Sequence, residues 1–420
     1  MKADPTAHNR WRLLTLGLIA LGCAALACAH GGDFAPPSPT TPAAAAAQPT
    51  PPSQPHPGAA LAVAYECNRC HNIDGLPAIP TQKHCVRCHQ EILAGTFDAP
   101  QDALADWQAR LTSLNEVPDL SAGTTALNPQ WVQNLLLNPH KIRPRLPASM
   151  PRLQITPQDA ATIADWLTHK TPTPPSQTPG QPQNGRRLLD QHGCTACHLF
   201  SGAPSPAPNA AALASLTPAA MVRGMTMAPD LRHTRQRRSE AWVAAWIQHP
   251  NPDSAMPSFD ISPQDAADMA AWIIQTPLAE LPKATIPQRL PLLERKVAYE
   301  ELETKIFKKV CWHCHSDPDF ADGDGGPGYT GGFGFVGRQI SFADRFSTMA
   351  GGLTTEGNRR SLLHRLPDGT PWLVAALLAR HAEEAGQTIP GLRGMPLGLP
   401  AIPIEDIQLL DTWIHSMPTP

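Results

Sequence analysis

One five-residue pattern occurs four times in this chain of 420 residues: two cysteines separated by two residues, with a histidine directly after the second cysteine. Random placement of the 10 cysteines and 17 histidines predicts roughly 0.01 such matches, so chance does not explain them. The four copies are Cys67-Asn-Arg-Cys70-His71, Cys85-Val-Arg-Cys88-His89, Cys194-Thr-Ala-Cys197-His198 and Cys311-Trp-His-Cys314-His315. Any fold of this chain therefore has to place the same small site four times.

The pattern C-x-x-C-H is the attachment signature of c-type haem. Its two thiols form thioethers with the haem vinyl groups, and the adjacent histidine becomes the proximal ligand of the iron. One turn of helix puts both sulfurs and the imidazole on one side of the porphyrin. The sequence therefore predicts four covalent haem c groups, with the proximal ligands His71, His89, His198 and His315.

A zinc site is the alternative for the first two copies. Cys67 and Cys70, followed by Cys85 and Cys88, nearly fit the spacing of a zinc ribbon. Both cysteine pairs carry the additional histidine, however, and the other two copies stand alone in the chain. The chain also begins like an exported protein, so the four copies favour haem over zinc.

Residues 1–31 are predicted to be a secretory signal peptide. A basic segment with Lys2, Arg10 and Arg12 precedes an apolar run over residues 13–27. This run is too short and too rich in glycine and alanine to predict a transmembrane helix. We therefore expect the mature protein on the periplasmic side of a bacterial cell envelope, where c-type haem is attached.

Two cysteines of this leader, Cys23 and Cys28, each follow a short apolar sequence that resembles a bacterial lipobox. Lipidation of either one would anchor the protein to the membrane through its N-terminus. Ordinary cleavage near Ala27 or Ala29 is the alternative, and it would leave a soluble protein. The other eight cysteines all lie in the C-x-x-C-H copies, so no disulfide is expected in the mature chain.

Proline-rich segments divide the remaining chain, which contains 48 prolines but only 5% aromatic residues. Such segments act as semi-extended spacers between folded domains. The expected spacers are 32–58, 171–184 and 277–290, and the expected domains are 59–170 with two haems, 185–276 with one haem and 291–420 with one haem.

The first two predicted domains share an internal repeat. Asp119 to Trp131 and Asp230 to Trp242 both span twelve residues, and Met150 to Trp166 and Met256 to Trp272 both span sixteen. The third predicted domain is a longer variant of the same unit, in which Met395-Pro396 precedes the last helix.

Helices are expected before each haem motif and at the end of each domain. Thr156 should cap a terminal helix from Pro157 to about His169, with Asp159 completing a capping box. A charged helix from about Leu292 to Lys309 should lead into the fourth motif. The glycine-rich segment 323–337 predicts a loop that packs close to haem.

A haem iron that only transfers electrons needs a distal ligand, either a thioether or a second imidazole. Methionine in most chains fills the core. Met150, Met256 and Met395, however, each precede a proline on a loop before a terminal helix, and this repeated context favours them as distal ligands.

The order helix, C-x-x-C-H, loop, Met-Pro, helix resembles class I cytochrome c, and the Pro-Asp-Leu runs at 118–120 and 229–231 are typical of its bacterial members. The resemblance covers about residues 59–420 apart from the spacers. It implies an all-α fold of three tandem cytochrome c-like domains, each with haem in a crevice.

The first predicted domain departs from this family pattern because it contains two haem motifs but one Met-Pro. The candidates for the missing distal ligand are His84, directly before Cys85, and His140, ten residues before Met150. Either His84 serves the first haem and Met150 the second, or Met150 serves the first and His140 the second. An open, five-coordinate iron is the remaining possibility.

The sequence thus predicts an exported tetrahaem electron carrier that works in a respiratory-type chain with redox protein partners or a membrane respiratory complex. The formal net charge of -3 does not suggest a nucleic-acid partner. A haem enzyme such as a peroxidase is one alternative, and it would use an open haem in the first domain. A fixed cytochrome subunit of a larger membrane redox complex is the other alternative.

Overall fold

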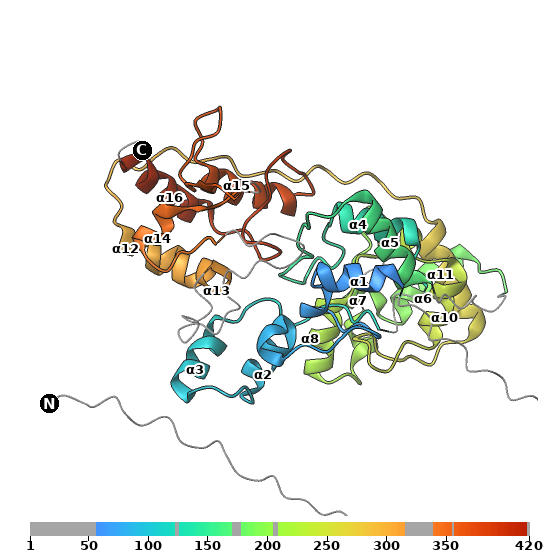
Figure 1. Cartoon of the computed structure of the whole chain (residues 1–420). Coiled ribbons are helices and arrows are strands. Elements are labelled where there is room, and N and C mark those ends of the chain that lie inside the picture. Colours follow the sequence, from blue (N-terminus) through green and yellow to red (C-terminus); the bar gives the residue numbers. More distant parts are fainter. Residues whose placement is uncertain are drawn as a thin grey trace, which may run out of the picture. The chain divides into compact units, whose positions relative to one another are not determined.

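The structure, a computed structural model, describes residues 56–121, 126–169, 178–204, 209–315, 339–354 and 357–417. Residues 54–420 form one compact unit. Helices dominate the described residues, in agreement with the all-α prediction (Figure 1). The strands found among them are β1 (Gly352–Leu353) and β2 (Arg359–Arg360), which pair antiparallel. The division into three domains stays a prediction.

Several predicted features lie outside the described residues. These are the signal peptide with Cys23 and Cys28, the glycine-rich segment 323–337, and parts of the spacers 32–58 and 171–184. Within the described ranges, the structure contains no helix that is long and apolar enough to cross a membrane.

The first haem motif lies among three helices that share one hydrophobic core. Helices α1 (Pro57–Ala64) and α4 (Pro129–Leu137) both pack on α5 (Pro157–Thr168). The short 3₁₀ helix η1 (Cys67–Arg69) follows α1 and carries the motif. Tyr65 and Trp131 lie in the core between these helices.

The second haem motif has a small core of its own, which the sequence did not indicate. It follows the 3₁₀ helix η2 (Thr81–Lys83) and opens α2 (Cys85–Ala94), which packs on α3 (Gln101–Arg110). Cys88, Ile92 and Leu104 form the buried centre of this cluster. The segment between the first motif and Pro118 is therefore an insertion into the unit that α1, α4 and α5 form.

The third motif lies in a second copy of the α1–α4–α5 arrangement. Helices α6 (Pro182–Gln191) and α10 (Glu240–Gln248) pack on α11 (Pro263–Gln275), as α1 and α4 pack on α5 (Figure 1). The segments between them are α7 (Cys194–Cys197), η3 (Ala210–Leu213), α8 (Pro218–Met227), η4 (Leu231–His233) and α9 (Thr234–Arg237). The structure thus repeats the element order that the sequence spacings predict.

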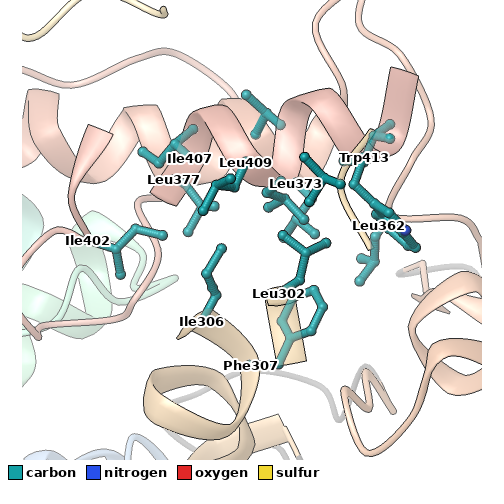
Figure 2. Packing of buried hydrophobic residues seen from close by; sticks show 14 of the residues in the cluster. Leu302, Ile306, Phe307, Leu362, Leu373, Leu377, Ile402, Ile407, Leu409 and Trp413 are labelled. Atoms are coloured by element: carbon teal, nitrogen blue, oxygen red, sulfur yellow. The ribbon is translucent and has the colours of Figure 1, made fainter. Parts of the chain in front are cut away.

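The fourth motif follows a helix whose backbone changes type along its length. The first segment, α12 (Tyr299–Leu302), is an α-helix. It continues as the π-helix η5 (Glu303–Cys311) and ends as the α-helix α13 (Trp312–His315). Helices α14 (Arg345–Ala350), α15 (Trp372–Glu384) and α16 (Ile404–Ser416) complete this part of the chain. Figure 2 shows Leu302, Ile306 and Phe307 packed against side chains of α15 and α16, among them Leu373, Leu377, Ile407 and Trp413.

The predicted start of this charged helix at Leu292 is wrong, because the helix begins at Tyr299. The backbone N–H of Leu293 donates a hydrogen bond of 3.0 Å to Thr412 Oγ1 on α16, which holds the segment before the helix against α16. Arg295 then forms an ion pair with Glu301 in the first turn. A contact with a residue more than a hundred positions away thus overrides the local helical propensity.

The predicted helix cap at Thr156 is confirmed. Thr156 Oγ1 accepts a hydrogen bond of 3.1 Å from the N–H of Asp159, and α5 begins at Pro157 as expected. Asp159 does not complete a capping box, however. Its carboxylate accepts a hydrogen bond of 2.9 Å from the hydroxyl of Tyr65 and so ties α5 to the end of α1.

Glycines allow the two equivalent helix pairs to cross at close range. A Cβ at Gly185 would overlap the carbonyl oxygen of Asp268 and lie 2.8 Å from Cβ of Trp272 on α11. A Cβ at Gly58 would likewise overlap Cβ of Trp166 on α5. Both glycines precede the first cysteine of their haem motif by nine residues, so these crossings fix where the motif begins.

We expect Gly185→Ala to lower the free energy of unfolding by about 3 kcal/mol, because the added methyl group would force α6 away from α11. Guanidinium unfolding of the holoprotein, followed by far-UV circular dichroism, measures this change. Arg186→Ala on the exposed face of the same helix is the control, and it should change stability by less than about 0.5 kcal/mol. Equal effects of the two variants would contradict the close crossing.

Candidate haem sites

Backbone carbonyls orient the predicted proximal histidines of the first and third motifs in the same way. His71 Nδ1 lies 2.8 Å from Pro118 O, and His198 Nδ1 lies 2.9 Å from Pro229 O. An imidazole that donates from Nδ1 presents Nε2 to a metal, and such a second hydrogen bond fixes the ring. These carbonyls belong to the repeated Pro-Asp-Leu runs, although 47 residues separate His71 from Pro118 and 31 residues separate His198 from Pro229.

The corresponding histidines of the second and fourth motifs have other neighbours. His89 Nδ1 lies 3.2 Å from Leu114 O, and Leu114 has a left-handed backbone with φ of 58°. His315 packs edge-on against the ring of Phe342, with 5.5 Å between the ring centres. The Pro-Asp-Leu contact is thus a feature of the repeated units, and the inserted second motif has a different support.

Burial lowers the pKa of all four predicted proximal histidines. The pKa values of His89 and His315 fall to about 4, and those of His71 and His198 are also below their ordinary value. Desolvation is the largest cause in each case, because it disfavours the charged imidazolium. All four imidazoles are therefore neutral at pH 7, which is the form that binds a metal.

Burial also raises the pKa of most of the motif thiols, which reaches about 11 in Cys67 and Cys88 and about 12 in Cys194 and Cys311. Cys85 is the exception. Its pKa falls to about 7, mainly because the thiol of Cys70 donates a hydrogen bond to it. The pKa of Cys70 rises in turn. The first and second motifs therefore touch through their sulfur atoms.

Further contacts bring the other motifs close to this pair. The rings of His89 and His313 lie 5.8 Å apart between their centres, which joins the second motif to the fourth. The guanidinium of Arg69 feels the charge of Cys85 and of Cys314, although Glu66 is the stronger partner that raises its pKa. Arg69 of the first motif therefore lies within electrostatic reach of the second and fourth motifs.

The third motif approaches the first across two segments of the chain. Arg145 donates hydrogen bonds to the carbonyl oxygens of Ala196, at 3.3 Å, and Cys197, at 2.8 Å, within the third motif. Burial is the main reason why the pKa values of His71 and His198 are lowered, and the positive charge of Arg143 lowers both further. Arg143 therefore lies within electrostatic reach of both histidines.

Two of the three predicted methionine ligands pack against the same cores as a motif cysteine. Met150 and Cys67 contact one cluster, and Met395 and Cys311 contact another. Met256 Sδ accepts a hydrogen bond of 3.1 Å from Trp246 Nε1. The loops that carry Met150 and Met395 also touch, because the N–H of Ser149 donates to Gly398 O at 2.8 Å. Ligation by these methionines stays a prediction.

The two histidine candidates have different surroundings. His84 is 4% exposed, its Nδ1 accepts a hydrogen bond of 3.1 Å from the N–H of Arg87, and its Nε2 is enclosed without a hydrogen-bond partner among the described residues. His84 also adds to the electrostatic lowering of the pKa of His71, after larger effects of burial. His140 lies beside His233, with 5.1 Å between the ring centres.

A cluster of half-buried cations without carboxylate partners fits the propionates of haem. Arg143 and Arg237 form no ion pair with any carboxylate in the described part of the chain, and burial lowers their pKa to about 10 and about 9. Arg237 lies over the ring of Trp131, 5.1 Å from its centre. Arg237 Nε and Trp131 Nε1 are both enclosed and lack a hydrogen-bond partner among the described residues. Such groups are costly to bury unless a ligand pairs with them.

The sequence did not single out these arginines. The run Arg235–Arg238 contains three arginines without an acidic neighbour, and this is the signal that indicates an anion site. A cavity of about 380 Å³ borders the run and is lined by Asn128, Arg238 and Trp242 among other residues.

We expect Arg237→Gln to lower the reduction potential of the first haem, because a haem carboxylate that loses its cation stabilises the ferric iron. A redox titration followed by visible spectroscopy measures the shift. Arg186→Gln removes the same charge from the exposed face of α6 and should leave the potential unchanged. Equal shifts in both variants would show that only the net charge matters.

The geometry does not support the zinc alternative. In the described ranges, no group of three or more His, Cys, Asp or Glu side chains is placed to hold a metal ion. Cys70 and Cys85 touch, but the four cysteines of the first two motifs do not converge on one point.

Comparison with known proteins identifies a family for one part of the chain. No curated protein and no solved structure matches the chain. The family model for cytochrome c matches residues 182–277, which contain the third motif, helices α6 to α11 and Met256. These residues form a cytochrome c domain, a type of domain that binds haem c covalently and transfers electrons.

Proposed function

We propose that the chain is an exported tetrahaem c-type cytochrome that passes electrons from site to site in a respiratory-type chain. The observation that carries this proposal is the contact between neighbouring haem motifs. Electron tunnelling weakens steeply with distance, so haem sites whose ligands touch exchange electrons faster than separate ones. A protein whose first, second and fourth motifs are joined by such contacts, with Arg143 close to both the first and the third, is suited to move electrons through its own length.

The contacts favour one order of sites that differs from the order in the sequence. The order is third, first, second and fourth motif. Arg143 lies close to both His198 of the third motif and His71 of the first. The Cys70–Cys85 contact joins the first motif to the second, and the ring pair of His89 and His313 joins the second to the fourth. In this proposal, electrons enter or leave at the third and fourth motifs, where redox protein partners or a membrane respiratory complex would dock.

The N-terminal leader supports a location for this activity outside the cytoplasm. In this proposal residues 1–31 direct export to the periplasmic side of a bacterial cell envelope, and Cys23 or Cys28 carries a lipid. The proline-rich stretch that follows would let the haem sites work at a distance from the membrane.

Electron paramagnetic resonance of the ferric holoprotein and a redox titration test this proposal. We expect four low-spin haems, three of them with relatively high potentials, because methionine ligation raises the potential relative to a second imidazole. Four identical low potentials would contradict the assignment of the methionines. A high-spin haem that binds cyanide and turns over peroxide would support the enzyme alternative instead.

A further inference from the structure

The rings of His89 and His313 form a pair between two haem motifs. Their centres lie 5.8 Å apart and their planes are inclined by 49°. His89 is the proximal histidine of the second motif and is 8% exposed. His313 is the residue directly before Cys314, so it belongs to the fourth motif but is not its proximal ligand. The two side chains therefore come from segments more than two hundred residues apart.

This separation matches two imidazoles on opposite sides of one metal ion. Bonds of about 2.0 Å from the metal to each nitrogen, with about 1.1 Å from each nitrogen to its ring centre, place the centres about 6 Å apart. The Nδ1 atom of His89 is 3.2 Å from Leu114 O, so Nε2 is the nitrogen of His89 that is available to a metal.

We propose that His313 is the distal ligand of the iron at the second motif, opposite His89. The proposal rests on the proposed function, because it requires haem at this motif. It assigns one distal ligand to each site: Met150 to the first, His313 to the second, Met256 to the third and Met395 to the fourth. The insertion that carries the second motif then needs no methionine of its own.

The surroundings of the other candidates favour His313. His84 directly precedes Cys85 and uses its Nδ1 to cap α2, which ties it to the proximal side of its own motif. His140 instead pairs with His233, with 5.1 Å between the ring centres. Met150 packs against the core of Cys67, whereas Cys88 belongs to a different cluster.

This assignment has a functional consequence. A ligand from the fourth motif on the iron of the second motif would join the two sites mechanically, so a change at one would reach the other. A pair of histidine ligands also lowers the potential relative to a histidine and a methionine. The second site would then be the low-potential step between two sites of higher potential.

The test uses the tetrahaem holoprotein and its His313→Ala variant, with ferric spin states measured by electron paramagnetic resonance. We expect one of the four haems to become high-spin, and added imidazole to return it to the low-spin state. His140→Ala is the matched control and should keep all four haems low-spin. A His313→Ala protein with four low-spin haems, or a high-spin haem in His140→Ala, would overturn the assignment.

A second variant covers the case in which His313→Ala does not fold. His313→Met keeps a ligand at the same place and should raise the ratio of ferrous to ferric haem at the second site at least tenfold at fixed potential, which is about 59 mV for a one-electron couple. No shift in this ratio would also overturn the assignment. Intact mass of the same samples counts the haems. A wild-type protein without haem at Cys85 and Cys88 would overturn the proposed function and this assignment together. A wild-type protein with four haems, together with His313 variants whose spin states and potentials equal those of the wild type, would overturn only the assignment.

Discussion

Met395→Leu should turn the fourth haem from low-spin to high-spin and lower its ratio of ferrous to ferric iron at least tenfold at fixed potential, which is about 1.4 kcal/mol. Leucine keeps the apolar volume but has no thioether to bind the iron. Sulfur ligands favour ferrous iron, so their loss lowers the potential. Electron paramagnetic resonance and a redox titration of the holoprotein measure the two changes.

Met417 provides a matched control for this prediction. It also precedes a proline and packs against the same hydrophobic cluster as Met395 and Cys311, but it follows the last helix instead of preceding it. Met417→Leu should therefore leave all spin states unchanged. A high-spin haem in Met417→Leu, together with wild-type spectra in Met395→Leu, would show that Met417 and not Met395 is the distal ligand.

Removal of both cysteine sulfur atoms of the third motif should abolish covalent haem attachment at this motif. We expect the double variant Cys194→Ser with Cys197→Ser to carry three haems and to lose one quarter of the haem absorbance of the wild type. Cys194 packs against the core that also contains Leu188, Ile247 and Trp272. Loss of the covalent group should therefore also lower the melting temperature of this region, because a bound cofactor stabilises the folded state.

Ala196→Ser is the control for the double variant. It alters the same motif but keeps both sulfur atoms and His198, and Arg145 bonds only to the backbone carbonyl at this position. The control should keep four haems and the melting temperature of the wild type. Four haems in the double variant would show that the third motif does not attach haem through its cysteines.

Local patterns predicted the parts of the fold that depend on neighbours in the sequence. Thr156 caps α5 as expected, since a cap needs only the next three residues. The repeated spacings predicted that α4 and α10 would take equivalent places, because an equal number of residues separates equivalent contacts. The carbonyls of Pro118 and Pro229 then gave the Pro-Asp-Leu runs a physical role.

Contacts between distant residues were not predictable in this way. The pairing of His89 with His313 and the contact of Cys70 with Cys85 depend on how separate segments pack. The charged helix started late for the same reason, because Thr412 holds Leu293 outside it. Composition gave no sign that Arg237 would lie over Trp131. The ligands of the second motif belong to this class, which is why the sequence left them open.

The order of the sites also depends on packing. In the sequence the third motif stands between the second and the fourth, whereas its contacts in the structure lead to the first. The first motif thereby becomes the centre of the proposed route, with the third motif on one side and the second and fourth on the other.

The intact mass of the purified holoprotein tests the central claim most directly. The account predicts a protein that keeps four haem groups after denaturation, because all eight motif cysteines hold them covalently. Peptide mapping should find one haem on each of the four C-x-x-C-H segments. A mass with fewer than four haems, or with zinc that is lost on denaturation, would contradict it.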